Sequence, residues 1–142
     1  MDYFKSDNQN GIYILRLDPG DYVLESINSM TEREKIDYAV VLSGIGTLDK
    51  YVMHMVTTVG YPPVEFLDKK DNRPYELVCI NGLIVNKKPH LHMVISDDKM
   101  AYGGHLEDGC RVLYIAEIVI QAFDGFKIKR INNQNGIMEL IK

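Results

Sequence analysis

The stretch of sequence that decides the fold is residues 89–96, which run Pro-His-Leu-His-Met-Val-Ile-Ser. In a β-strand, residues i and i+2 point to the same face and lie about 6.5–7 Å apart. A strand here sends its odd-numbered apolar residues to one face, which we expect to be core, and His90 and His92 to the other. Two imidazoles on one face can close on one ion at bond lengths of ~2.0–2.1 Å.

A third histidine follows at the length of a short hairpin. Residues 101–106 run Ala-Tyr-Gly-Gly-His-Leu and are expected to pair back onto the first strand, which brings His105 beside His90 and His92. The two glycines allow close approach of a neighbouring strand or a ligand. We therefore predict a zinc site formed by His90, His92 and His105. A second interpretation stays open, in which the histidines are polar surface residues and the two glycines mark an ordinary turn.

Length and composition indicate one globular domain, residues 1–142, with 46% apolar and 25% charged residues. The net charge of −4 argues against a broad nucleic-acid-binding face, because phosphate neutralisation needs clustered Lys and Arg. DNA binding is therefore expected to be weak or absent. The apolar runs are far shorter than the ~20 residues that span a bilayer, and the first residues lack a signal sequence. We expect no membrane association and a cytoplasmic location.

The two cysteines, Cys79 and Cys110, have no Cys-x-x-Cys partner. In a reducing compartment they are expected to be buried, small apolar side chains. Cys110 follows the third histidine closely, so a role as a fourth metal ligand is the alternative.

Hydrophobic patterns predict a sheet covered by one amphipathic helix, residues 21–35. Residues 38–42 form a continuous apolar run, expected to be a strand buried on both faces. Residues 64–74, which follow Tyr61-Pro62-Pro63, are expected to form an irregular polar loop. Strands are predicted at 11–17, 38–42, 51–57, 75–82, 90–96, 101–106, 111–123, 126–131 and 137–141.

Glu117 stands in the middle of the nearly apolar run 111–123. Burying an unpaired carboxylate costs several kcal/mol, so Glu117 is expected to be hydrogen-bonded, ion-paired or beside a metal. Two interpretations stay open. Glu117 is either a catalytic carboxylate next to the metal or half of a buried ion pair with a residue such as Arg111.

Five motifs occur along the chain in this order: Val40–Gly46, Arg73–Leu77, Pro89–His92, Gly103–Leu106 and Ala116–Ile120. In sequence and order they resemble the plants-and-prokaryotes conserved (PPC) domain, best known from AT-hook plant nuclear proteins. The resemblance covers residues 11 to about 131. It implies an α+β fold, a mixed, largely antiparallel β-sheet flanked by few α-helices, assembled as a homotrimer. The Arg-Gly-Arg-Pro core of an AT-hook does not occur in this sequence.

The resemblance implies a stand-alone prokaryotic PPC protein: a zinc-binding homotrimer with a small-molecule ligand-binding or regulatory role, with DNA association as an option. The fold is also similar to that of acetolactate decarboxylase, where a His-x-His pair and a later histidine hold zinc. The matching residues are His90, His92 and His105. The alternative is therefore a zinc-dependent lyase or hydrolase acting on a small carboxylated or ester substrate. An interaction domain without metal is the third possibility.

Overall fold

The computed structural model describes residues 1–7 and 11–142, which form one helix and nine strands. Every strand pairing in this part of the chain is antiparallel, and the predicted α+β fold is confirmed. The elements are β1 (Asp2–Lys5), β2 (Ile12–Leu17), α1 (Val23–Arg33), β3 (Tyr38–Val56), β4 (Glu65–Val85), β5 (Lys88–Ser96), β6 (Ala101–Leu106), β7 (Arg111–Ala122), β8 (Lys129–Asn132) and β9 (Met138–Ile141).

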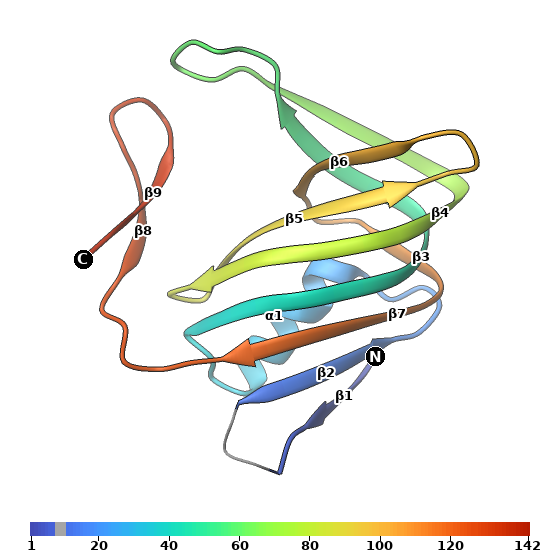
Figure 1. Ribbon diagram of the computed structural model, residues 1–142, viewed down its shortest axis with the longest axis horizontal. Helices are drawn as coiled ribbons and strands as arrows, with labels where there is room; N and C mark the ends of the chain where they lie inside the picture. Colours follow the sequence, from blue (N-terminus) through green and yellow to red (C-terminus); the bar gives the residue numbers. More distant parts are fainter. Residues whose placement is uncertain (8–10) are drawn as a thin grey trace.

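Seven strands form the main sheet in the order β1-β2-β7-β3-β4-β5-β6, and β6 also pairs with β3. The sheet therefore curls until its last strand meets its middle one. Strands β8 and β9 form a separate hairpin, the C-terminal hairpin, that stands beside the main sheet (Figure 1). These two strands were predicted, with β8 starting later than expected.

The single helix of the described chain covers one face of the sheet, and it lies behind the strands in Figure 1. Val23, Ile27 and Met30 recur at helical spacing and are fully buried, which confirms the predicted amphipathic helix. Each such side chain contributes roughly 1.5–3 kcal/mol on burial. The core therefore lies between α1 and the sheet. With 11 residues, α1 is too short to cross a membrane.

Two sequence predictions about strand length are wrong. Strand β3 runs without interruption for 19 residues, where two short strands were expected. Strand β4 has 21 residues and begins at Glu65, inside the expected loop 64–74. The outer parts of β3 and β4 form an arm that extends beyond the sheet (Figure 1). The β4 part of the arm is polar and mostly exposed, so alternation of apolar residues does not reveal it.

The sheet face turned away from α1, here called the open face, is only partly polar. Four apolar side chains on it are between 43% and 50% exposed: Ile14, Ile45, Val78 and Ile115. Strand β3 is therefore not buried on both faces as predicted, and Leu42 is 51% exposed.

Glu117 also lies on the open face and is exposed, so the prediction that it is buried is wrong. Its register partners are Arg16 on β2 and Ile45 on β3. The pattern misled because β7 is apolar on both faces while only one face is covered. Arg111 donates instead to Asp49, at 2.8 and 2.9 Å.

Both cysteines are free thiols, and Cys110 is fully buried as predicted. The Cys110 Sγ donates to the Val52 carbonyl and accepts from the Val52 N–H, both at 3.2 Å. Burial raises the pKa of the Cys110 thiol to about 12. The Cys110 thiol therefore lies in the core and is engaged in hydrogen bonds with the Val52 backbone.

Candidate metal centre

All four histidines of the chain lie close together on three neighbouring strands. His54 on β3 is in register with His105 on β6, and His105 is in register with His92 on β5. Residues directly opposite each other on antiparallel strands share a face, with Cβ atoms ~4.5–5.5 Å apart. The His105 ring centroid lies 4.5 Å from that of His54, 5.1 Å from His90 and 5.5 Å from His92.

Gly104 explains how β6 comes so near to β3. A Cβ atom at this position would lie 2.8 Å from the His54 carbonyl oxygen, closer than real side chains come. At Gly103 the nearest atom would be 3.5 Å away, an ordinary contact. The close approach expected from the glycine pair is thus confirmed for Gly104, and it is this glycine that brings His54 to His105.

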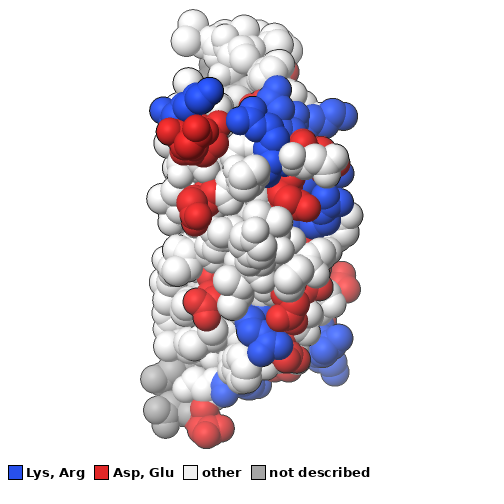
Figure 2. Space-filling view, turned by 90° about the vertical axis from the view of Figure 1, so that its right-hand side faces the viewer, with Lys and Arg blue, Asp and Glu red and all other residues white. Residues whose placement is uncertain are grey.

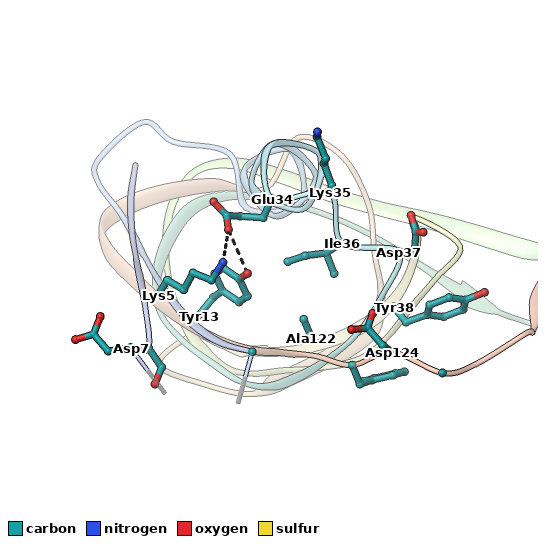
Figure 3. Close-up of a pocket in the computed structure, with 14 residues that line it drawn as sticks. Lys5, Asp7, Tyr13, Glu34, Lys35, Ile36, Asp37, Tyr38, Ala122 and Asp124 are labelled. Atoms are coloured by element: carbon teal, nitrogen blue, oxygen red, sulfur yellow. Dashed lines mark hydrogen bonds and ion pairs between the residues drawn. The ribbon is translucent and has the colours of Figure 1, made fainter. Parts of the chain in front are cut away.

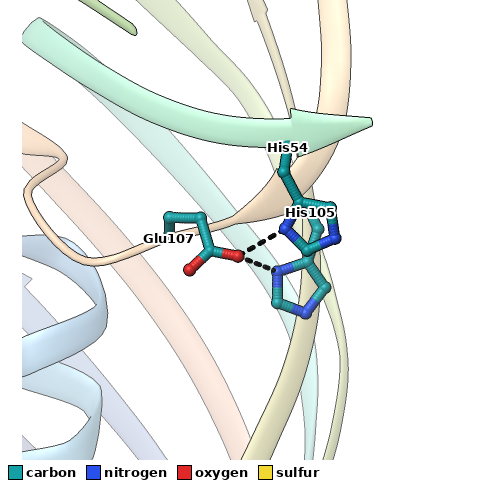
Figure 4. Close-up of side chains that lie close together, drawn as sticks. All are labelled: His54, His105 and Glu107. Atoms are coloured by element: carbon teal, nitrogen blue, oxygen red, sulfur yellow. Dashed lines mark hydrogen bonds and ion pairs between the residues drawn. The ribbon is translucent and has the colours of Figure 1, made fainter. Parts of the chain in front are cut away.

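The carboxylate of Glu107 joins two of the rings (Figure 4). Its Oε1 lies 2.5 Å from His54 Nδ1 and 2.9 Å from His105 Nδ1. A carboxylate accepts, so each Nδ1 carries a hydrogen and donates it, which leaves the Nε2 lone pair of each neutral ring available. Metal-binding histidines are commonly oriented by a carboxylate in this way.

The donor atoms of His54, His105 and Glu107 lie within 4.8 Å of one another, the one group of this kind among residues 1–7 and 11–142. Two ligands of a tetrahedral zinc ion are about 3.3 Å apart when bonds are 2.0–2.1 Å. The Glu107 oxygen is closer than that to both nitrogens, so Glu107 fits as the orienting group. The Nε2 atoms of His54 and His105 are then the ring nitrogens left to accept a metal.

His90 and His92 are bonded differently. Arg130 Nη1 lies 2.9 Å from His90 Nδ1, and since a guanidinium only donates, this nitrogen accepts. The His90 hydrogen is therefore on Nε2, which lies 3.3 Å from His92 Nε2 and donates to it. The pKa of both histidines is lowered, mainly by burial and, for His90, also by the charge of Arg130.

The structure thus brings the predicted residues His90, His92 and His105 together and adds two that sequence reasoning missed. His54 was visible only as the fourth histidine, on a strand whose pairing with β6 could not be inferred. Glu107 follows His105 by two residues, directly after β6 ends. Neither position carried a signal of its own.

The four histidines line a cavity of about 660 Å³ between the arm and the C-terminal hairpin. Its other walls include Met55, Val56 and Met138, and Glu65 adds a carboxylate whose Oε1 is 3.7 Å from His54 Nε2. A cavity of this size suits a small organic ligand. Glu117 does not line it.

A second cavity of about 660 Å³ lies where α1 ends, against β1 and β2 (Figure 3). Glu34 accepts hydrogen bonds there from the Tyr3 hydroxyl at 2.8 Å, Lys5 Nζ at 3.1 Å and the Tyr13 hydroxyl at 3.2 Å. These contacts, that of Tyr3 above all, hold the pKa of Glu34 below its usual range. The polar groups bind one another and tie β1 to the helix.

A family model described as the Plants and Prokaryotes Conserved (PCC) domain matches residues 4–124. A plant- and prokaryote-conserved protein from Pyrococcus horikoshii superposes with a TM-score of 0.79 at 25% identity, covering 92% of this chain and 91% of that one. A putative DNA-binding protein from Bacteroides thetaiotaomicron gives 0.84 at 18% identity, over 99% and 96%. A metal-containing protein from Archaeoglobus fulgidus gives 0.77 at 22% identity, over 92% and 93%.

The chain is also similar to two proteins that are more distantly related. A Staphylococcus aureus protein of unknown function, similar to α-acetolactate decarboxylase, superposes with a TM-score of 0.54 at 18% identity, over 85% of this chain and 54% of that one. The predicted likeness to the decarboxylase fold is thereby confirmed. Among curated proteins, the bifunctional protein GlmU of a Synechococcus strain is 26% identical over 120 residues, and the chain spans 18% of its length.

Proposed function

The chain belongs to the Plants and Prokaryotes Conserved domain family, and from this premise we propose that it is a zinc-binding homotrimer with a small-molecule ligand-binding or regulatory role. The observation that carries the proposal is the shared carboxylate of Glu107, which holds His54 and His105 with their Nε2 atoms available. Imidazole ligands suit zinc among the common divalent metals. The metal-containing Archaeoglobus protein supports the proposal.

Under this proposal the ligands are drawn from all four histidines. His54 and His105 are oriented for binding, and His105 also belongs to the set predicted from the sequence. When bound, zinc would supply a Lewis acid beside the cavity. Glu65 stands on the Nε2 side of His54, while Glu107 holds the two rings from behind.

The direct test is elemental analysis of protein purified without a histidine tag. We expect about one zinc ion per chain in the wild type and its loss in His54→Ala and His105→Ala. Lys99→Ala, in an exposed turn outside the cavity, is the matched control and should keep the metal. Equal metal content in wild type and His105→Ala would contradict the proposal.

The proposed trimer rests on the open face. Ile14, Ile45, Val78 and Ile115 leave an apolar surface on one side of the sheet, and exposed apolar patches of this kind mark interaction sites. A second copy of the chain would cover these side chains. Glu117 lies on the same face, opposite Arg16 in register. Arg16 pairs with Asp2 and Asp18 within the chain, so Glu117 is the charge that this face offers for pairing across such an interface.

DNA association is proposed to be weak. In Figure 2 the Lys and Arg side chains alternate with Asp and Glu, and no continuous basic surface is visible on that face. Binding through phosphates alone is indifferent to sequence and falls steeply with salt. Fluorescence anisotropy with labelled duplexes should show micromolar or weaker affinity at physiological salt. Sequence-specific binding with nanomolar affinity would instead favour DNA binding as the function, which is the role that the name of the Bacteroides protein suggests.

A zinc-dependent lyase or hydrolase is the second candidate, favoured by the open cavity beside the histidines. The carboxylate placed to move a proton there is Glu65, at the wall of the cavity. Screening small carboxylic acids and esters should then find a substrate whose turnover is lost in Glu65→Gln while zinc is retained. Loss of turnover in Glu117→Gln instead would restore the catalytic role predicted for Glu117.

A further inference from the structure

The cavity beside the histidines has two walls that project from the sheet, the arm and the C-terminal hairpin. We propose that these walls select an uncharged aliphatic ligand, whose chain lies between them and whose single polar group reaches the histidines. Met138 of the hairpin and Val56 of the arm would set this specificity. The proposal rests on the ligand-binding part of the proposed function, not on zinc, and gives the class of ligand.

The hairpin turns Met138 toward the histidines. In its register Asn132 pairs with Met138 and Arg130 pairs with Leu140. Paired residues share a face of a two-stranded ribbon, as do residues two apart on one strand, so Met138 lies on the same face as Arg130. Arg130 Nη1 lies 2.9 Å from His90 Nδ1. The face that carries Met138 is therefore the one turned to the histidine cluster.

Contacts at its base hold the hairpin beside the main sheet (Figure 1). The Tyr38 hydroxyl on β3 donates to the Ile128 carbonyl at 2.9 Å. The ring of Phe126, which precedes β8, lies edge to face with that of Phe123, with centroids 5.2 Å apart. The match to the family model ends at residue 124. The hairpin wall is thus fixed in place and is formed by residues outside the matched region.

Both walls are apolar. Ile137 and Met138 line the cavity from the hairpin, and Met55 and Val56 line it from the arm. Val56 is 58% exposed and Met138 is 40% exposed in the chain, so contact with an aliphatic chain would remove apolar surface from water on both sides. The volume of about 660 Å³ lies within the range of small-molecule sites. An aliphatic chain would therefore gain free energy from each wall.

The lining also limits the charge of the ligand. Among the described residues around the cavity there is no lysine or arginine, Arg130 included, and Glu65 is the one acidic residue. A carboxylate ligand would meet no cationic side chain in the wall and would face the negative charge of Glu65. An uncharged head group, as in an alcohol, a ketone or an ester, avoids this cost and can hydrogen-bond to the histidines.

The first experiment measures how the full chain binds the straight-chain primary alcohols butanol, hexanol and octanol, by NMR of ¹³C-methyl-labelled methionines. We expect the signals of Met55 and Met138 to shift, while that of Met100, on an exposed turn outside the cavity, stays in place. Affinity should rise about 4-fold with each added methylene. Affinity that does not depend on chain length, or equal shifts at Met100, would overturn the inference.

The second experiment compares hexanol with hexanoate. It uses chelator-treated protein, because the charge of a bound metal would otherwise attract the carboxylate. Hexanol should bind at least about 10-fold more tightly, since the walls offer the carboxylate no partner. Equal or tighter binding of hexanoate would overturn the choice of an uncharged ligand.

The third experiment changes one wall at a time. Met138→Ala and Val56→Ala should each weaken hexanol binding by about 3- to 10-fold. Leu140→Ala, on the same hairpin face, and Val59→Ala, in the turn of the arm, are matched controls outside the cavity lining and should bind like the wild type. Val56→Ala leaves the hairpin untouched, so it tests the inference even if Met138→Ala unseats the hairpin. Wild-type affinity in Val56→Ala, or an equal loss in Val59→Ala, would overturn it.

Zinc content, measured on the same samples before chelator treatment, separates the two proposals. A zinc-loaded wild type whose affinity for alcohols does not depend on chain length would overturn the ligand class and leave the zinc site intact. A wild type without zinc that still binds longer alcohols more tightly, with a loss in Val56→Ala, would overturn the zinc site and support the ligand class.

Discussion

His54 and His105 occupy paired positions on β3 and β6, and their rings stack with centroids 4.5 Å apart and planes 22° from parallel. The contact closes the sheet at this end, because β3–β6 is the pairing that joins its last strand to its middle. Fold closure and assembly of the histidine site are therefore one structural event. Changes that separate these strands should act on both.

Glu107→Gln tests the orienting carboxylate. The amide keeps the size of the side chain but accepts only weakly from two ring N–H groups, so we expect zinc affinity to fall by about 10- to 100-fold. Chelator competition measures the change. Asp108→Asn, at the exposed neighbouring position, should bind zinc like the wild type. If both variants lose zinc affinity equally, the loss comes from removing a negative charge near the site and not from breaking the contact between Glu107 and the rings.

Gly104→Ala tests the close approach of β6 to β3. The new methyl group would lie 2.8 Å from the His54 carbonyl oxygen, so the strands must separate and His105 must move away from His54. We expect weaker zinc binding and a lower free energy of unfolding. Gly103→Ala meets only ordinary contacts and should be tolerated. A Gly104→Ala variant with wild-type zinc affinity would show that this spacing is unimportant.

Ile14→Glu tests the open face as an oligomer interface. Ile14 is 45% exposed in the single chain and its register partner on β7 is Val119, so a carboxylate there costs little unless a second copy covers it. Light scattering should give three times the chain mass of 16.2 kDa for the wild type and a smaller mass for the variant. Met100→Glu places the same charge on an exposed turn residue and should stay trimeric. A wild type that is monomeric at micromolar concentration would refute the trimer.

Glu34→Gln tests the contacts that tie β1 and β2 to α1. Its pKa is lowered in the folded protein, first by the Tyr3 hydroxyl. The stabilisation is therefore present above the unfolded pKa, ~4.3, and is lost as the pH falls through the lower folded value. We expect Glu34→Gln to reduce the free energy of unfolding by roughly 1–3 kcal/mol at pH 7.

Denaturant unfolding at pH 7 and at successively lower pH measures this difference. The gap between wild type and Glu34→Gln should narrow once the pH falls below about 4. Glu32→Gln changes an exposed carboxylate on the same helix and should track the wild type throughout. A gap that stays constant with pH would mean that the ionised carboxylate is not the source of the stabilisation.

Local patterns predicted the hairpin β5–β6 and the face on which its histidines lie. Residue alternation fixes which side chains share a face, and a short connection between adjacent strands fixes their pairing. The approach of His54 could not be predicted in this way, because β3 and β6 are far apart in the sequence and only the closure of the sheet joins them.

Glu117 shows the opposite limit. Alternation indicates a buried strand when both faces are apolar, but it cannot say whether the second face packs against the same chain. In β7 one face packs within the chain, toward the helix side, while the other carries exposed Ile115 and Glu117. The second apolar face of β7 is therefore a surface that the single chain does not cover.

Anomalous diffraction at the zinc edge, from crystals of the wild type grown with one equivalent of zinc, tests the metal site most directly. We predict one strong peak per chain, about 2.0–2.1 Å from the Nε2 atoms of His54 and His105, with Glu107 still bonded to both Nδ1 atoms. A peak away from these two nitrogens, or no peak at this cluster, would contradict the proposed zinc site.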